Sequence, residues 1–139
     1  MSTKIVLQVP SDPNMSRVAR LAAGGLCSLL GFDVDQIEDV KIAVSEIILA
    51  LIENGDGGEI TLRFETDPES PSQTLSPTGS DEEGRTLSVS GSTVCVAFDA
   101  SAVELELCRA VLSGVSKSCS IMSTPTGAEI RVVLPGERE

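Results

Sequence analysis

The spacing of hydrophobic residues divides the first part of the chain into a strand and a helix. Residues 3–9, TKIVLQV, alternate mildly, are rich in β-branched side chains and stop at Pro10, which predicts a strand. Residues 14–30 change to helical spacing and are followed by Gly31, a residue typical of helix C-termini. The side of this helix expected to face the core carries Met15, Val18, Leu21, Ala22, Leu26, Leu29 and Leu30.

A second helix is predicted from Asp35 to Asn54. Asp35 is expected to cap it, with Glu38 completing a capping box, and the pair Asn54-Gly55 is expected to close it. The predicted core face carries Ile37, Val40, Val44, Ile47, Ile48 and Leu51. Roughly opposite lie carboxylates at seven-residue spacing, Asp39, Glu46 and Glu53, flanked by Ile42, Ala43, Leu49 and Ala50. A side that is both apolar and acidic is not an ordinary solvent face, so we expect it to contact something.

The middle of the chain predicts strands around a long loop. After a turn at 55–58, GDGG, residues 59–65 alternate as a strand with its apolar side chains on one face. Residues 66–85 are rich in Pro, Ser, Thr and acidic residues and cannot bury enough apolar surface to order themselves. They predict a mobile loop inside one domain, not a domain boundary. Strand-like sequence resumes at 86–90 and again at 93–98.

The last part of the chain predicts one helix and two strands. SAVE, residues 101–104, has the form of a capping box. The helix that it opens is expected to bury Val103, Leu107, Ala110, Val111 and Gly114. Residues 117–123 and 128–134 are predicted strands joined by a turn. The order β-α-α-β-β-β-α-β-β indicates an α+β fold in which one mixed sheet is covered on one face by helices.

Composition narrows the choice of partners. A chain of 139 residues is long enough for one domain, which we expect to span 1–139. Its 21 acidic against 10 basic residues give a net charge of −11, which repels nucleic acid and anionic membranes and favours a basic or apolar protein surface. With no signal-peptide pattern and no run long enough to span a membrane, we expect a cytoplasmic protein.

The residue types that usually carry catalysis are scarce. The chain has no histidine, so it lacks the commonest general base, and any catalysis would rest on carboxylates. Its cysteines lack C-x-x-C spacing and predict reduced, buried thiols instead of a zinc site. They are Cys27, Cys95, Cys108 and Cys119.

The segment QIEDVKIAVSEIILAL resembles the helix that carries the N-box in the anti-sigma factor and serine-protein kinase family, a branch of the GHKL superfamily. The match runs from Ile37 to Glu46, and the order of elements agrees with that family outside the 66–85 loop. The resemblance implies a two-layer α/β sandwich of the Bergerat, or histidine-kinase-like ATPase, type. Such a fold has a mixed, mainly antiparallel sheet covered on one face by about three helices. Members of the family bind ATP with magnesium, phosphorylate a serine on an anti-anti-sigma partner and sequester a sigma factor.

The resemblance also assigns candidate site residues. In the family the N-box Glu is the general base, and an Asn four residues later holds the metal. Glu46 matches the Glu, but the Asn position is Ala50, whose methyl group cannot coordinate a cation. Asn54 is the remaining polar candidate for cofactor binding, and it could substitute only if the last helical turn were distorted.

Other nucleotide-binding elements of the family are missing. The adenine-reading D-x-G-x-G segment should fall near TLSVSGSTV, which retains only Gly91. The glycine-rich lid should fall near FDASAVEL, which has no glycine, and the family's G-T pair has no counterpart in Thr126-Gly127-Ala128. We therefore expect no metal and no cofactor, unless the pocket still accepts ATP and magnesium.

Three functions are compatible with the sequence. The first is a transcription regulator of the anti-sigma type that has lost kinase activity and binds a sigma factor, an anti-anti-sigma protein or both, with a homodimer as an open alternative. The second is an active ATP-dependent serine-protein kinase with Glu46 as general base and Asn54 or water completing the metal shell. The third is an independent domain that uses the 66–85 loop as a tether or as a phosphorylation target. The hydroxyls available there are those of Ser70, Ser72, Ser76 and Thr78.

Overall fold

The computed structural model describes residues 3–66, 86–95 and 98–134. Its strands are β1 (Lys4–Val9), β2 (Ile60–Thr66), β3 (Leu87–Val94), β4 (Ser118–Ser123) and β5 (Gly127–Leu134). Its helices are α1 (Met15–Leu30), α2 (Val34–Asn54), the short 3-10 helix η2 (Val103–Leu105) and α4 (Glu106–Val115). Apart from Thr66, the predicted loop at 66–85 lies outside the described residues, so it stays a prediction.

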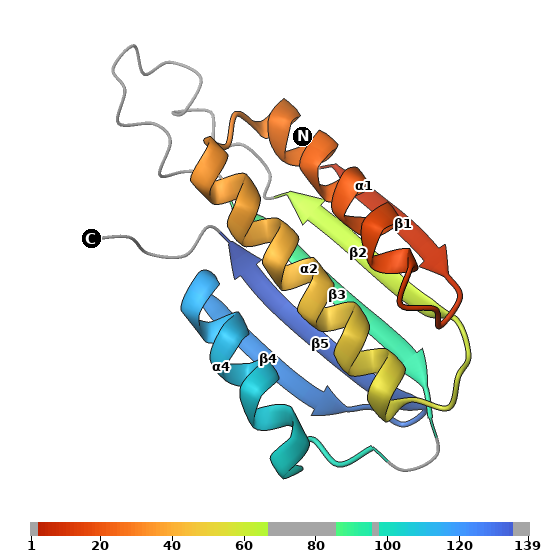
Figure 1. The fold of residues 1–139 in the computed structure, drawn as a ribbon. Coiled ribbons are helices and arrows are strands. Elements are labelled where there is room, and N and C mark those ends of the chain that lie inside the picture. The colour runs from red at the N-terminus through yellow and green to blue at the C-terminus, as the bar shows by residue number, and fades with distance from the viewer. Residues whose placement is uncertain (1–2, 67–85, 96–97, 135–139) are drawn as a thin grey trace.

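The strands form a five-stranded sheet in the order β1-β2-β3-β5-β4. Every neighbouring pair among these strands is antiparallel. The helices α1, α2 and α4 lie on one face of the sheet, with α2 across its middle (Figure 1). The predicted α+β sandwich is therefore confirmed, with a sheet that is antiparallel throughout the described strands instead of mixed. No helix in that part of the chain is long and apolar enough to cross a membrane.

The contact between α2 and the middle of the sheet forms the centre of the core. The predicted core face of α2 is confirmed, since five of its six residues are buried and Ile37 is half-buried. Gly91 on β3 lies against this face. A Cβ atom at Gly91 would stand 2.5 Å from Ile47 Cγ2 and 3.0 Å from Leu51 Cδ1. Such contacts are too short for real side chains, so glycine at this position lets α2 lie close to the sheet.

The buried face of α1 differs from the prediction. Helix α1 packs against α2, and its buried residues are mostly small: Ala19, Ala23, Leu26 and Cys27. Val18, Leu21 and Leu29, which we expected inside, are 43%, 77% and 84% exposed. The prediction is confirmed for Leu26 and wrong for these three residues, because helical spacing picks out large side chains, whereas a close contact between helices selects small ones.

Both ends of α2 differ in detail from the prediction. Its N-terminal cap is Asp33, not Asp35, because the Asp33 carboxylate accepts a hydrogen bond from the Gln36 N–H at 2.7 Å. The Gln36 side chain in turn accepts one from the Asp33 N–H at 2.9 Å, which completes a capping box two residues earlier than expected. The helix ends at Asn54 as predicted, but Gly55 has an extended φ of −100° instead of a left-handed conformation.

One continuous strand, β3, covers most of the two strands predicted at 86–90 and 93–98; residues 96 and 97 of the second lie outside the described residues. Residues from Leu87 to Val94 pair without interruption with both β2 and β5. The Ser-Gly-Ser sequence around Gly91 lowers the local strand propensity. Tertiary packing against α2 overrides that local preference.

The start and the buried face of the last helix were also predicted wrongly. The α-helix begins at Glu106, after the turn η2, and neither element has a side-chain cap at its N-terminus; the Ser101 hydroxyl donates to Asp99 Oδ1 at 2.7 Å. The residues that enter the core are Leu105, Cys108 and Leu112. Val103 and Leu107 are instead 78% and 74% exposed. Two apolar stripes run along this segment, and the neighbouring elements α2 and β4 decide which one is buried.

Candidate functional site

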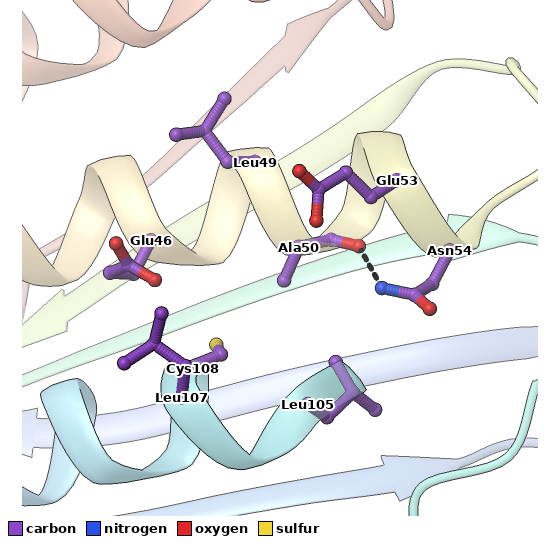
Figure 2. Close-up of a pocket in the computed structure, with 8 residues that line it drawn as sticks. All are labelled: Glu46, Leu49, Ala50, Glu53, Asn54, Leu105, Leu107 and Cys108. Carbon is purple, nitrogen blue, oxygen red and sulfur yellow. Dashed lines mark hydrogen bonds between the residues drawn. The ribbon is translucent and has the colours of Figure 1, made fainter. Parts of the chain in front are cut away.

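A pocket of about 180 Å³ lies between α2 and the η2–α4 segment (Figure 2). Its lining residues are Glu46, Leu49, Ala50, Glu53 and Asn54 from α2, with Leu105, Leu107 and Cys108 from the other side. The fold thus brings Glu46 and Asn54, the two site residues proposed from the sequence, to one cavity, with Ala50 between them. Asp39, the third carboxylate of the predicted stripe, does not line it.

The α2 wall of the pocket carries two carboxylates. Glu46 is half-buried, and burial, with a further contribution from the negative charge of Glu53, raises the pKa of its carboxyl group. Lys4 pairs with Glu65 and Lys41 with Glu38, and no basic side chain of the described residues forms an ion pair with Glu46 or Glu53. This wall is therefore negative, and its charge is not compensated by the described part of the chain.

The side chain of Asn54 forms a hydrogen bond with the backbone of α2 near the end of the helix. Its side-chain Nδ2 donates a hydrogen bond to the Ala50 carbonyl oxygen at 2.9 Å, as Figure 2 shows. In a regular α-helix the Ala50 carbonyl already accepts from the Asn54 N–H, so the side chain gives this oxygen a second donor and lies back along the last turn. Among the described residues, no group of three or more His, Cys, Asp or Glu side chains could hold a metal ion.

The opposite wall of the pocket is apolar. Leu105 and Cys108 are buried there, whereas Leu107 is exposed at the rim. Burial raises the pKa of the Cys108 thiol to about 11, and the charge of Glu46 acts in the same direction. The thiol is consequently protonated at neutral pH and is a poor nucleophile.

The sequence pattern did not lead us to predict Leu105 and Cys108 as lining residues. Leu105, Cys108 and Leu112 are separated by three and then four residues, the spacing of one helix face, and this pattern could have identified them. The prediction for the thiols themselves holds: all four cysteines are free, three are buried and Cys119 is half-buried.

The segment before α4, where the family's glycine-rich lid was expected, is held by side-chain hydrogen bonds. The Asp99 carboxylate accepts from the Ser101 N–H at 3.0 Å as well as from its hydroxyl, and these bonds lower the pKa of Asp99. Arg109 Nη2 donates to the Ala100 carbonyl oxygen at 2.6 Å, which ties the segment to α4. The guanidinium group of Arg109 is thus engaged with this backbone.

The two glycines near the expected nucleotide motifs have packing roles. Gly91 accommodates α2, as described above. A Cβ atom at Gly127 would stand 2.0 Å from the Thr93 carbonyl oxygen, where β5 begins beside β3. Neither glycine lines the pocket.

These features define the class of protein: a two-layer α+β sandwich with an acidic and apolar pocket between its long central helix and its last helix. No family model matches the chain. It is similar to the serine-protein kinase RsbW of Listeria monocytogenes serotype 4a (strain HCC23), with 41% identity over 68 residues, which cover 46% of this chain and 43% of that protein.

Two further relatives carry the same name. The serine-protein kinases RsbW of Oceanobacillus iheyensis and of Bacillus subtilis (strain 168) are 38% and 36% identical to the chain over 64 residues. Each of these matches covers 43% of this chain and 40% of the relative. The chain therefore spans less than half the length of the curated relatives that it matches. The resemblance to the serine-protein kinase family, first drawn from Ile37 to Glu46, is confirmed by these similarities.

Proposed function

We propose that the chain is a single regulatory domain of the anti-sigma type, which binds a sigma factor, an anti-anti-sigma protein or both, and which does not use ATP. The similarity to RsbW supports the choice of partners. The pocket between α2 and α4 is the observation that carries the rest of the proposal, because its size and lining differ from what a nucleotide needs. The proposal includes a cytoplasmic location, where such partners would be met.

The size of the pocket argues against a nucleotide. Pockets that enclose small-molecule ligands have volumes of about 300–1,000 Å³, whereas this one measures about 180 Å³. Leu105 and Cys108 occupy the side toward α4. A nucleotide would have to displace this helix, whose buried residues belong to the core.

The chemistry of the lining points the same way. Phosphate groups in this pocket would face Glu46 and Glu53, and no basic side chain is among the lining residues to offset the repulsion. Ala50 offers no ligand at the expected metal position, and the amide of Asn54 is bonded to the helix end. Magnesium and ATP therefore do not fit the residues present here.

Two measurements test the proposal. Titration calorimetry and thermal unfolding with Mg-ATP should show no binding, whereas a ligand at 100 times its dissociation constant would stabilise the fold by about 2.7 kcal/mol. Purified sigma factors and anti-anti-sigma proteins should bind the chain directly without nucleotide. Micromolar binding of Mg-ATP, with transfer of phosphate to a partner serine, would overturn the proposal.

An active kinase is the second candidate, because Glu46 and Asn54 do line one pocket. In that case the wild-type chain would transfer phosphate from ATP to a serine of the partner, and Glu46→Gln would abolish the transfer.

A separate proposal is that the chain associates with a second copy of itself as a homodimer. It predicts a sedimentation coefficient that rises with protein concentration, and a monomer at all concentrations would contradict it.

A further inference from the structure

We propose that the cleft between α2 and α4 is a docking groove for an amphipathic helix of a partner protein, with an apolar side chain in the pocket and Lys or Arg residues beside Glu46 and Glu53. This inference rests on the proposed function only in taking a protein as the occupant. It adds the position of the contact and the chemistry of the segment that binds.

The pocket has the size of an apolar side chain. An apolar cavity of about 150 Å³ in another protein is known to hold one benzene molecule, and the volume here is about 180 Å³. The inner surface is formed by Leu105 and Cys108, both buried, and by the methyl group of Ala50. A leucine or phenylalanine side chain inserted there would bury part of its surface against these three residues.

Apolar side chains also continue outside the pocket. Leu107 is 74% exposed and Leu49 is 37% exposed, and these two residues stand on the two helices that form the cleft. Val103, four residues before Leu107, is exposed as well. Large apolar side chains that surround a cavity on two adjacent elements are typical of a protein-binding groove.

The charge of the groove selects a basic partner. The carboxylates of Glu46 and Glu53 both border the pocket (Figure 2). The charge of Glu53 already disfavours the ionised form of Glu46, so a cation placed between or beside them relieves a repulsion that is present in the free chain. The net charge of −11 attracts a basic segment over longer distances and repels an acidic one.

The spacing of the two glutamates favours a helix over an extended segment. Seven residues of α2 separate Glu46 from Glu53, which corresponds to about 10 Å along the helix axis. A partner helix that lies along α2 repeats the same spacing. Basic residues at positions i and i+7 would then flank an apolar residue at i+3 or i+4, on one face of the partner.

The test uses a synthetic 18-residue helix-forming peptide of leucine and lysine with this arrangement, labelled with a fluorophore. A peptide of the same composition in scrambled order is the control for unspecific attraction to an acidic protein. Fluorescence anisotropy at physiological salt should show tighter binding of the patterned peptide. Equal affinity for the two peptides would overturn the proposal.

Two pairs of variants locate the binding site. Leu107→Ser and Glu53→Lys should each weaken binding of the patterned peptide at least tenfold. Leu29→Ser removes an equally exposed leucine from α1, and Glu59→Lys makes the same charge change at an exposed site outside the cleft. These two controls should change the affinity less than twofold. All four positions are exposed, and circular dichroism with thermal unfolding verifies that each variant is folded. If the controls weaken binding as much as the cleft variants, the groove is not the site.

The same variants separate this inference from the proposed function. If the wild-type chain binds a sigma factor and Leu107→Ser and Glu53→Lys bind it equally well, the groove proposal fails and the proposed function stands. If the patterned peptide binds in the groove but neither class of partner protein binds the chain, the proposed function fails and the groove proposal stands.

Discussion

The two sides of α2 differ in how closely they are packed. Toward the sheet, Ile47 and Leu51 are buried, and the contact is so close that β3 carries Gly91 beneath them. Toward α4, Glu46, Ala50 and Glu53 border a pocket that the chain leaves open. One helix can thus stabilise the fold with one face and present a recognition surface with the other. Because the sheet side holds the backbone in place, changes on the α4 side should alter binding more than stability.

The largest effect is expected on the sheet side. Ile47→Ala should lower the free energy of unfolding by about 3 kcal/mol, since it removes buried carbons from a close-packed site and leaves a cavity. Leu49→Ala, on the half-exposed side of the same helix, should lower it by less than about 1 kcal/mol. Urea denaturation of both variants measures the difference. Equal losses would show that the two sides of α2 are packed alike.

Adding one methyl group to the sheet should also be costly. Gly91→Ala should lower the free energy of unfolding by about 2 kcal/mol, because its Cβ would overlap Ile47 and force α2 or β3 to move. Gly25→Ala is the matched control: no atom lies within 4 Å of its added Cβ. That substitution within α1 should raise stability by up to about 1 kcal/mol. Chemical denaturation under identical conditions checks both, and a stabilised Gly91→Ala variant would contradict the described packing.

Adding a larger group on the α4 side should be tolerated. Ala50→Leu introduces three carbon atoms, but they can enter the open pocket, so the free energy of unfolding should change by less than about 1 kcal/mol. The added side chain would fill the pocket in which, by the groove proposal, an apolar side chain of the partner binds. Ala50→Leu should therefore abolish binding of the patterned peptide. Unfolding and anisotropy measurements on the same sample test both statements. A loss of stability as large as that of Gly91→Ala would mean that the pocket cannot admit a side chain.

The smallest effect concerns the charge of Glu46. Its raised pKa means that the folded chain holds the proton more tightly than the unfolded chain, so the ionised carboxylate lowers stability at neutral pH. This penalty decreases as the pH falls through the folded pKa and is absent below the unfolded value. Glu46→Gln should therefore be more stable than the wild type at pH 7, by a few tenths of a kcal/mol. The advantage should shrink at pH 3.5, and denaturation curves at the two pH values measure it. An advantage that grows toward low pH would contradict the direction of the shift.

The same comparison explains which predictions succeeded. The predicted core face of α2 is buried because this helix lies across the middle of the sheet, where all its large apolar side chains on that side meet β3 and its neighbours. For α1 the prediction holds at Leu26 but not at Leu21, and for α4 the predicted Leu107 is exposed. Local spacing alone does not decide which apolar side chains of a helix are buried, because the choice also depends on the shape of the element that packs against the helix.

The candidate site shows a similar division. Glu46, Ala50 and Asn54 were identified from the resemblance of one helix, since a continuous motif is a local property of the chain. Leu105 and Cys108 were not, because they come from a segment more than fifty residues later and reach the pocket only when α4 packs beside α2.

By itself the sequence determined the strands, the long central helix and the acidic character of one of its sides, all of which depend on short-range periodicity and charge. Tertiary structure decided the continuity of β3, the orientation of α1 and α4, and the apolar filling that makes the pocket small. These features depend on contacts between residues far apart along the chain, where steric fit outweighs local propensity.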